Sequence, residues 1–234
     1  MYIYEQAFKE SVRLILMIEQ QWQRIQELIE TEISPKSSEM VLNELIRLLE
    51  MLDRSDIKVK LLQELTGAQE RAAKLFEEDA ISEQDFDEFK HSCESTAKKL
   101  AMASRVLSKP LLEDPLLSAL FYKQTTIYTS FYCDTWRWQS EEEKKLQVSY
   151  WMDKLSSVDH AVRLIMWIVR ASGQFRSVNI VSGFYRDSMI GRDVLDVSLI
   201  RINCESPKVH PTVSIAKHWV ALTLYASQWD DGVF

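Results

Sequence analysis

Apolar residues recur at the period of an α-helix over the first hundred residues of the chain. In residues 5–31 they follow one another at steps of three and four, which predicts one long amphipathic helix. Three further segments carry the same kind of stripe, at about 39–53, 57–78 and 82–103. Because the polar connections between these helices are short, the pattern favours an antiparallel bundle.

The pattern changes after residue 108. KPLLEDPLL (109–117) contains two prolines and interrupts the helical period. The next segment, 121–138, is crowded with Thr, Tyr, Phe and Trp, which favours a strand. On such a strand Trp136 and Trp138 would face the same side, as core residues or as a platform for a peptide. A fifth helix is predicted from Ser140, its N-cap, to about 172. Three strands follow, at about 174–182, 193–204 and 212–226.

These elements predict an α+β protein, mainly a helical bundle with a small and mostly antiparallel β-sheet. We expect a helical domain over residues 1–117 and a β-strand part over residues 118–234. The long helix within that second part, about 140–172, is expected to pack on the helical domain. Since predicted strands lie on both sides of this helix, the sheet is not expected to form a separate C-terminal domain.

The distribution of charge restricts the class of partner. Residues 1–117 hold 15 Lys and Arg against 23 Asp and Glu, a net of −8, whereas residues 118–234 have a net of +1. No basic block suggests contact with phosphates, so we predict no nucleic-acid partner. Neither an apolar run of about 18 residues nor a signal-like N-terminus is present, so neither membrane insertion nor export is expected. The three widely spaced cysteines are interpreted as reduced thiols of a cytoplasmic protein.

Signatures of catalysis and of metal binding are absent from the sequence. The five glycines stand alone, so no phosphate loop, dinucleotide fingerprint or nucleophile elbow is formed. His91 and Cys93 would lie on different faces of a helix, and His210 and His218 have no Cys or acid recurring with them. The acidic segment 76–88 lacks a calcium-loop spacing and is interpreted as a solvated junction, with a docking surface as the alternative. We therefore predict no catalytic residue, cofactor or metal. An enzyme with an unrecognised site is the weakest remaining alternative.

Several collinear segments resemble the ZapD family of bacterial cell-division proteins. They are YEQAFKESVRLILMIE (4–19), LNELIRLLEMLDRSDIKVKLLQEL (42–65), the helical segment 151–176, and GFYR (183–186) leading into the strand near 193–200. The resemblance covers nearly the whole chain. It implies a non-catalytic homodimer in the cytoplasm at the mid-cell division site. Such a protein would bind the C-terminal peptide of FtsZ where the sheet meets the helices, and would crosslink FtsZ protofilaments. The alternative is a dimeric helical scaffold or adaptor whose partner is not FtsZ.

The basic peptide pocket of the family carries over only in part to this chain. Arg13 and Arg54 fall on basic positions of the family, and Lys58 replaces a basic residue one helical turn beyond Arg54. Arginines of the family correspond here to three uncharged residues, which are Met17, Trp219 and Thr223. Lys217 and His218 alone keep basic character on the late strand. The resemblance therefore implies a less cationic pocket built from Arg13, Arg54, Lys58, Lys217 and Trp219. The simpler alternatives are a solvated helix residue for Arg13 and a helix-end cation for Arg54.

Overall fold

The computed structural model describes residues 2–30, 35–123, 127–180, 182–188, 197–216 and 219–226, with backbone alone at 35–37, 127–130 and 226. The chain divides into two compact units. We call residues 14–168 the helical unit, and residues 1–13 together with 169–234 the β unit. The boundary expected at 117/118 therefore falls inside the helical unit.

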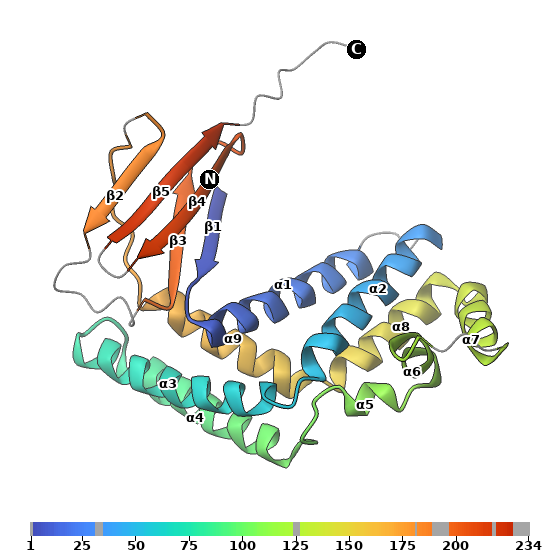
Figure 1. Cartoon of the computed structure of the whole chain (residues 1–234). Coiled ribbons are helices and arrows are strands. Elements are labelled where there is room, and N and C mark those ends of the chain that lie inside the picture. Colours follow the sequence, from blue (N-terminus) through green and yellow to red (C-terminus); the bar gives the residue numbers. More distant parts are fainter. Residues whose placement is uncertain are drawn as a thin grey trace, which may run out of the picture. The chain divides into compact units, whose positions relative to one another are not determined.

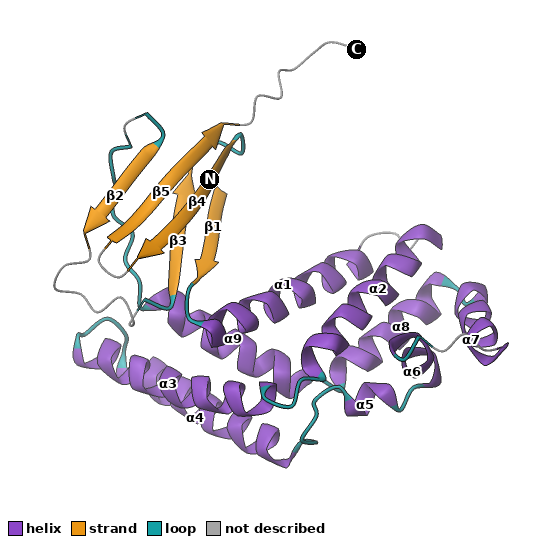
Figure 2. Cartoon of the chain, in the orientation of Figure 1, coloured by secondary structure: helices purple, strands orange, loops and turns teal. Residues whose placement is uncertain are grey.

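Helices make up the described part of the helical unit (Figures 1 and 2). They are α1 (Glu10–Glu30), α2 (Pro35–Leu52), α3 (Ile57–Glu77), α4 (Glu83–Met102), α5 (Lys109–Leu112), α6 (Pro115–Phe121), α7 (Ile127–Trp138), α8 (Glu141–Asp153) and α9 (Ser156–Ala171). α1 begins and α9 ends in the β unit. α3 and α4 run side by side as a hairpin. In the part of the chain that the structure describes, no helix is long and apolar enough to cross a bilayer.

The helical core is built from the apolar stripes of the sequence. Its largest fully buried side chains include Ile15, Ile18 and Ile25 on α1, Leu45, Leu48, Leu49 and Leu52 on α2, and Leu61 and Leu65 on α3. Burying one such side chain contributes about 1.5–3 kcal/mol. Ser82 accepts a hydrogen bond from the main-chain nitrogen of Asp85 at the start of α4, and Ser140 forms a capping box with Glu143 at the start of α8. These stripes and caps confirm the helical bundle that the sequence predicts.

Two small antiparallel sheets form the β unit (Figure 2). One pairs β1 (Tyr2–Ala7) with β3 (Leu199–Cys204), and the other has the order β2 (Phe184–Ser188), β5 (Trp219–Ala226), β4 (Val209–Ala216). The Gln6 side chain of β1 donates a hydrogen bond of 3.4 Å to the main-chain oxygen of Val213 on β4. The α+β fold class, mainly helical with antiparallel sheet, is therefore confirmed.

An ionic cluster joins three segments of the β unit. The Arg170 guanidinium at the end of α9 donates to both carboxylate oxygens of Glu5, at 2.8 and 2.7 Å. Arg201 lies directly opposite Glu5 in the β1–β3 register and brings its Nε within 3.1 Å of Glu5 Oε1. Burial raises the pKa of the Glu5 carboxyl, but the two arginines outweigh it and hold that pKa below its ordinary value. The carboxylate is therefore ionised at neutral pH and fixes β1 to α9 and β3.

The predicted start of the first helix is wrong. Residues 2–7 form β1, and α1 begins only at Glu10. The stripe that predicts the helix does continue upstream to Phe8, but the main-chain nitrogen of Phe8 donates to Ser198 at 3.0 Å and extends the pairing with β3. The tyrosines and isoleucine of this segment suit a strand as well as a helix, and a partner strand distant in sequence decides between them.

The strand predicted at 121–138 is also wrong, because residues 127–138 form α7. Trp136 is 2% exposed and its ring stacks on Trp151 of α8 with centroids 5.7 Å apart, whereas Trp138 is 80% exposed. The two tryptophans do not face the same side, since residues two apart on a helix point in nearly opposite directions. The Thr135 hydroxyl donates to the main-chain oxygen of Phe131 one turn earlier and is accommodated within the helix. Strand propensity depends strongly on packing context, and here the context is helical.

Element boundaries in the C-terminal half need four further corrections. The helix expected over 140–172 is two helices, α8 and α9, because the Leu155 carbonyl receives the first bonds of α9 at the junction. Residues 174–180 carry no strand, and β2 lies just beyond them. The strand expected at 212–226 is the antiparallel pair β4 and β5, and Lys217 and His218 between them lie outside the described residues. Of the strand expected at 193–204, residues 199–204 form β3 and residues 193–196 lie outside the described residues.

Candidate functional site

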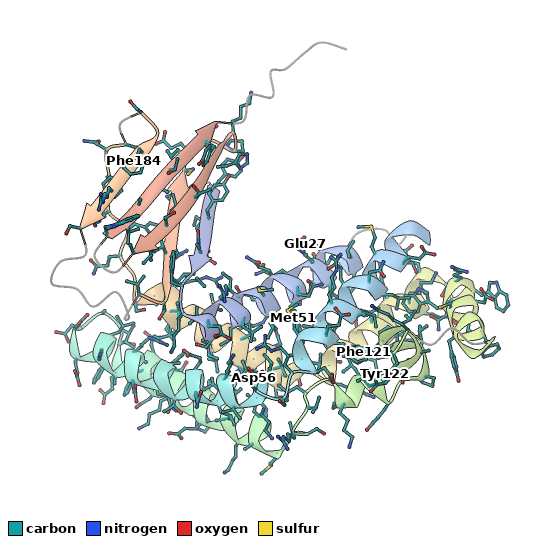
Figure 3. All side chains as sticks on the ribbon, in the orientation of Figure 1. Glu27, Met51, Asp56, Phe121, Tyr122 and Phe184 are labelled. Atoms are coloured by element: carbon teal, nitrogen blue, oxygen red, sulfur yellow. The ribbon has the colours of Figure 1, made fainter. Side chains whose placement is uncertain are left out.

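Arg54 lies in the turn between α2 and α3, next to Asp56, which Figure 3 labels. Its guanidinium donates to both carboxylate oxygens of Asp56, at 3.2 and 3.1 Å. Lys60, one turn into α3, brings its ammonium within 2.8 Å of the same carboxylate. The hydrogen bond from Lys60, followed by that from Arg54, lowers the pKa of Asp56 to about 2. One ionised carboxylate thus holds two cations at this turn.

The Arg54–Asp56 pair is open to solvent. The side chains are 49% and 43% exposed. Exposed ion pairs contribute little net stability because water and salt screen them. A carboxylate from a partner can therefore compete with Asp56 for the Arg54 guanidinium at small cost. This turn can present a cation to an acidic partner.

Lys58 stabilises the hairpin of α3 and α4. Its ammonium donates to the main-chain oxygens of Ala101 and Ala103, at 2.9 and 2.7 Å, where α4 ends. A cation at a helix C-terminus is favoured because the last carbonyls have no partner within the helix. Nearby, the buried Ser108 hydroxyl donates to Asp53 at 2.7 Å, so the turn is held at two points. Lys58 thus positions the turn that carries Arg54.

On the β unit, Trp219 begins β5 and is half-buried. The Arg186 guanidinium of β2 lies over its ring, 4.7 Å from the ring centroid. The register explains this contact, because Ser188 is opposite Trp219 and Arg186 is opposite Ala221, which places Arg186 diagonally across from the tryptophan. Trp219 stands where the resemblance implies an arginine, and Arg186 of the neighbouring strand brings a cation to this place. Arg186 is the last residue of the GFYR segment. Its contact with Trp219 depends on the pairing of β2 with β5, which the sequence pattern did not predict.

The remaining predicted residues fall in separate places. Arg13 and Met17 lie one turn apart on α1, and both side chains are exposed, Met17 at 48%. Thr223 on β5 is half-buried between Phe184 and Thr212, its partners on β2 and β4. Lys217 lies outside the described residues. Arg54 and Lys58 are brought together in the helical unit, while Arg13 and Trp219 belong to the β unit.

A family model described as "ZapD: Cell division protein" matches residues 16–223. This range includes the α2–α3 turn, the GFYR segment and most of β5. The chain belongs to the ZapD family. Its role is therefore in cell division, and membership of this family points to a non-enzymatic protein.

Relatives named "Cell division protein ZapD" agree with the family assignment. The protein of Enterobacter sp. (strain 638) is 30% identical over 158 residues, which cover 65% of this chain and 63% of the relative. The match therefore spans less than two thirds of that relative's length. The protein of Serratia proteamaculans (strain 568) is 27% identical over 173 residues, 71% of this chain and 67% of the relative. That of Cronobacter sakazakii (strain ATCC BAA-894) is 24% identical over 204 residues, 84% of this chain and 81% of the relative.

Proposed function

We propose that this ZapD-family chain binds the C-terminal tail of FtsZ and crosslinks FtsZ protofilaments into bundles, in the cytoplasm at the mid-cell division ring. Family membership over residues 16–223 is the observation that carries the proposal. A short tail buries little surface, so each contact is weak. A homodimer presents two tail sites, and many tails along a filament then hold it by avidity while a second filament is bridged.

Arg54 is our first choice for the contact with the tail in the helical unit. Its guanidinium is exposed and already engages a carboxylate in the bidentate manner that an acidic tail would use. The exchange of one carboxylate for another changes little in the protein itself. Lys58 supports this contact by fixing the turn.

In the β unit we assign the tail contact to Trp219 with Arg186, and we extend it to Arg13 and Lys217. The stacked Arg186 and Trp219 offer a cation and a flat apolar surface at one place. Such a pair suits a tail that carries both acidic and apolar residues. Because Met17 and Thr223 are uncharged, we expect salt to weaken binding only gently.

The surface that we assign to the homodimer lies on α7 and α8. Phe131 and Trp138 are seven residues apart on α7 and share one face, 59% and 80% exposed. Leu146 and Tyr150, four residues apart on α8, are 72% and 58% exposed. Exposed large apolar side chains in such number are typical of surfaces covered by a partner.

The decisive experiment for the tail contact is charge reversal. Arg54→Glu is expected to abolish bundling of polymerised FtsZ in low-speed sedimentation, because Glu repels an acidic tail. Its melting temperature is expected to move little, since the pair with Asp56 is exposed. Arg47→Glu is the matched control, because Arg47 is also exposed and paired, with Glu44 at 2.9 Å on α2. Normal bundling by Arg54→Glu would remove Arg54 from the site.

FtsZ without its tail tests the proposal as a whole. Co-sedimentation with the tail-less protein is expected to fall to background. Undiminished binding would place the contact elsewhere on FtsZ. Binding to neither form would favour the second candidate, a dimeric scaffold with another partner. That candidate is supported by the net charge of −8 on the helical unit, which disfavours an acidic tail.

The dimer is tested by mass in solution. Sedimentation equilibrium at micromolar concentration is expected to give about twice the chain mass of 27.4 kDa. The double variant Trp138→Glu, Leu146→Lys is expected to give the mass of one chain, because charges would be buried in the contact. Met102→Lys, at an equally exposed apolar residue on α4, should remain dimeric. A wild-type protein with the mass of one chain would contradict the dimer.

A further inference from the structure

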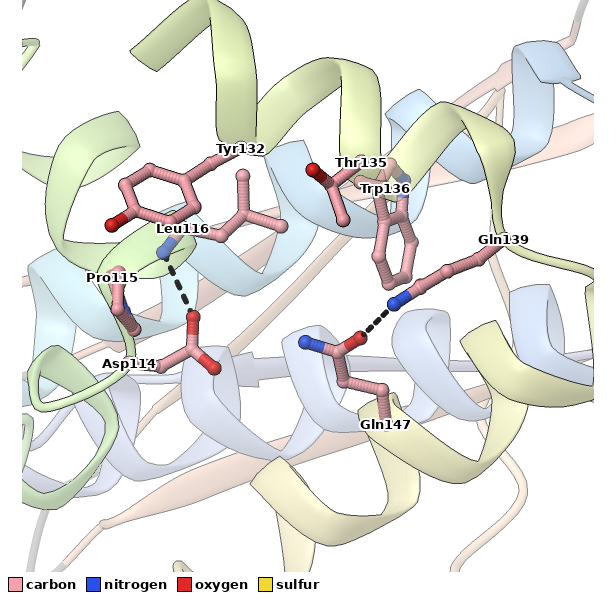
Figure 4. A pocket seen from close by; sticks show the side chains of 8 residues that line it. All are labelled: Asp114, Pro115, Leu116, Tyr132, Thr135, Trp136, Gln139 and Gln147. Atoms are coloured by element: carbon pink, nitrogen blue, oxygen red, sulfur yellow. Dashed lines mark hydrogen bonds between the residues drawn. The ribbon is translucent and has the colours of Figure 1, made fainter. Parts of the chain in front are cut away.

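A pocket of about 120 Å³ opens between α6, α7 and α8 in the helical unit (Figure 4). Its walls include Asp114, Leu116, Tyr132, Trp136, Gln139 and Gln147. One water takes on the order of 15 Å³ of such space, so the pocket has room for the end of a side chain. Pro115 and Thr135, which also line it, are exposed and give access from solvent. Neither the family assignment nor the proposed tail contact involves this pocket.

Two polar atoms in the pocket wall lack partners. Trp136 is 2% exposed, and its indole N–H finds no acceptor among the described residues. The side-chain oxygen of Gln139 is also buried and finds no donor there, although its amide nitrogen donates to Gln147 at 2.8 Å. A buried polar atom without a partner costs about 1–3 kcal/mol. Both atoms are themselves inaccessible to solvent, so the polar contacts of a ligand in the pocket must come from other groups of the wall.

Asp114 gives the pocket its charge. Its Oδ1 accepts from the main-chain nitrogens of Leu116 and Leu117, at 2.9 and 3.2 Å, and caps α6. Its Oδ2 accepts from the Trp151 indole at 3.0 Å. A carboxylate has about four acceptor positions, so roughly one is left. It is the one carboxylate among the residues that line the pocket, and no Lys or Arg lines it.

The net charge of the helical unit as a whole has the same sign as Asp114. The helical unit holds 19 Lys and Arg against 27 Asp and Glu, a net of −8. Such a field raises the local concentration of cations. Lys144 lies 5.8 Å from the Trp136 ring centroid, but its ammonium is directed to the main-chain oxygen of Arg137 at 3.4 Å. A cationic ligand is therefore favoured over an anionic one.

The shape of the wall and its hydrogen-bond donors restrict the class of ligand further. The Tyr132 ring forms one wall, a flat surface on which a planar cation can stack. Figure 4 shows the side-chain nitrogen of Gln147 pointing toward the Asp114 carboxylate across the pocket. The wall thus combines an acceptor for a cation, the Asp114 carboxylate, with a donor, the side-chain nitrogen of Gln147. An arginine residue matches both, because its guanidinium donates and its peptide carbonyl accepts.

We propose that the α6–α7–α8 pocket binds an arginine side chain of a protein partner, with Asp114 accepting from the guanidinium and Tyr132 stacking on it. The pocket is thus a recognition site for a basic segment, distinct in charge from the Arg54 turn.

N-acetyl-arginine amide is the probe, titrated into the full chain while the indole N–H resonances of the tryptophans are followed by NMR. We expect a saturable shift of the Trp136 resonance, identified by its loss in Trp136→Phe. N-acetyl-lysine amide and N-acetyl-glutamine amide are expected to bind more weakly. A glutamine probe that binds as tightly as the arginine probe would overturn the assignment of a cation. An unshifted Trp136 resonance would overturn the site.

Asp114→Asn is the sharpest variant, because Asn caps a helix as well as Asp does and removes the charge, together with the acceptor for the Trp151 indole. We expect about tenfold weaker binding of the arginine probe, which corresponds to about 1.4 kcal/mol. Glu113→Gln removes the adjacent exposed charge and should bind as the wild type does. If Asp114→Asn does not fold, Gln147→Leu tests the same wall and should also weaken binding. Equal affinity in all these variants would refute the proposal. So would a crystal grown with the probe that holds only water in the pocket.

Discussion

The two units of this chain are stabilised in different ways. The helical unit contains many large side chains that are fully buried, among them Trp151, Leu48 and Leu61. In the β unit the described buried apolar residues other than Val12 keep a small exposed fraction, for example Ala221, Val213 and Leu222. There, strand pairing and the Glu5–Arg170–Arg201 cluster join segments from both ends of the chain. A stable helical unit thus accompanies a β unit that depends more on directional contacts.

Charge separates the units as well. The helical unit carries −8, whereas the β unit holds 9 Lys and Arg against 8 Asp and Glu, a net of +1. The exposed ion pairs of the helical unit, such as Arg54 with Asp56, contribute little to its stability. In the β unit the Glu5 side chain is only 13% exposed and its pairs are shielded from water. The exposed ion pair of Arg54 in the helical unit can therefore be exchanged for a pair with a partner, whereas the shielded pairs of Glu5 in the β unit are structural.

Matched leucine truncations should give the largest effect and test the difference in cores. Leu48→Ala in α2 is expected to lower the free energy of unfolding by about 4 kcal/mol, because Leu48 is fully buried and the bundle around it cannot collapse. Leu222→Ala in β5, 7% exposed, is expected to cost about 2 kcal/mol. Urea denaturation followed by circular dichroism measures both. Equal costs would show that the β unit has a core as tightly packed as that of the bundle.

Removing the charge of Glu5 should have the next largest effect. Glu5→Gln is expected to cost about 1–3 kcal/mol at pH 7, because Arg170 and Arg201 lose a half-buried carboxylate. Since the folded pKa of Glu5 lies below its ordinary 4.5, the stabilisation is complete above that pH and is lost as the pH falls below it. The difference between wild type and variant should therefore shrink in acid titrations of stability. A difference independent of pH would show that packing, not charge, explains the loss.

The smallest effect is expected at a turn of the β unit. Gly183 has φ of +74°, and an added Cβ would lie 3.1 Å from the main-chain oxygen of Leu224. Gly183→Ala is expected to cost about 1–2 kcal/mol and to increase hydrogen exchange in β2 and β5. Gly173→Ala, also in the β unit, meets nothing closer than 3.8 Å and serves as the control. Comparable losses in the two variants would contradict the assignment of strain to Gly183.

Local patterns in the sequence account for much of the helical unit. The stripes of α2, α3 and α4 and the cap at Ser140 are correct as predicted, because these helices are specified by residues three and four apart. Arg54 was also placed correctly in a polar turn between two helices. Its pair with Asp56 is local, two residues away. Features whose partners are near in sequence could be predicted.

Tertiary structure decided the features whose partners are distant. Residues 2–7 are a strand because β3, about 200 residues away, pairs with them, and residues 127–138 are a helix because Trp136 packs on Trp151. The Lys58 ammonium donates to a main-chain oxygen at the end of α4. The Arg186 guanidinium contacts the Trp219 ring because of the register between β2 and β5. Aromatic and β-branched residues are compatible with both helix and strand, and long side chains reach several partners. Their final state therefore depends on contacts that no local pattern in the sequence encodes.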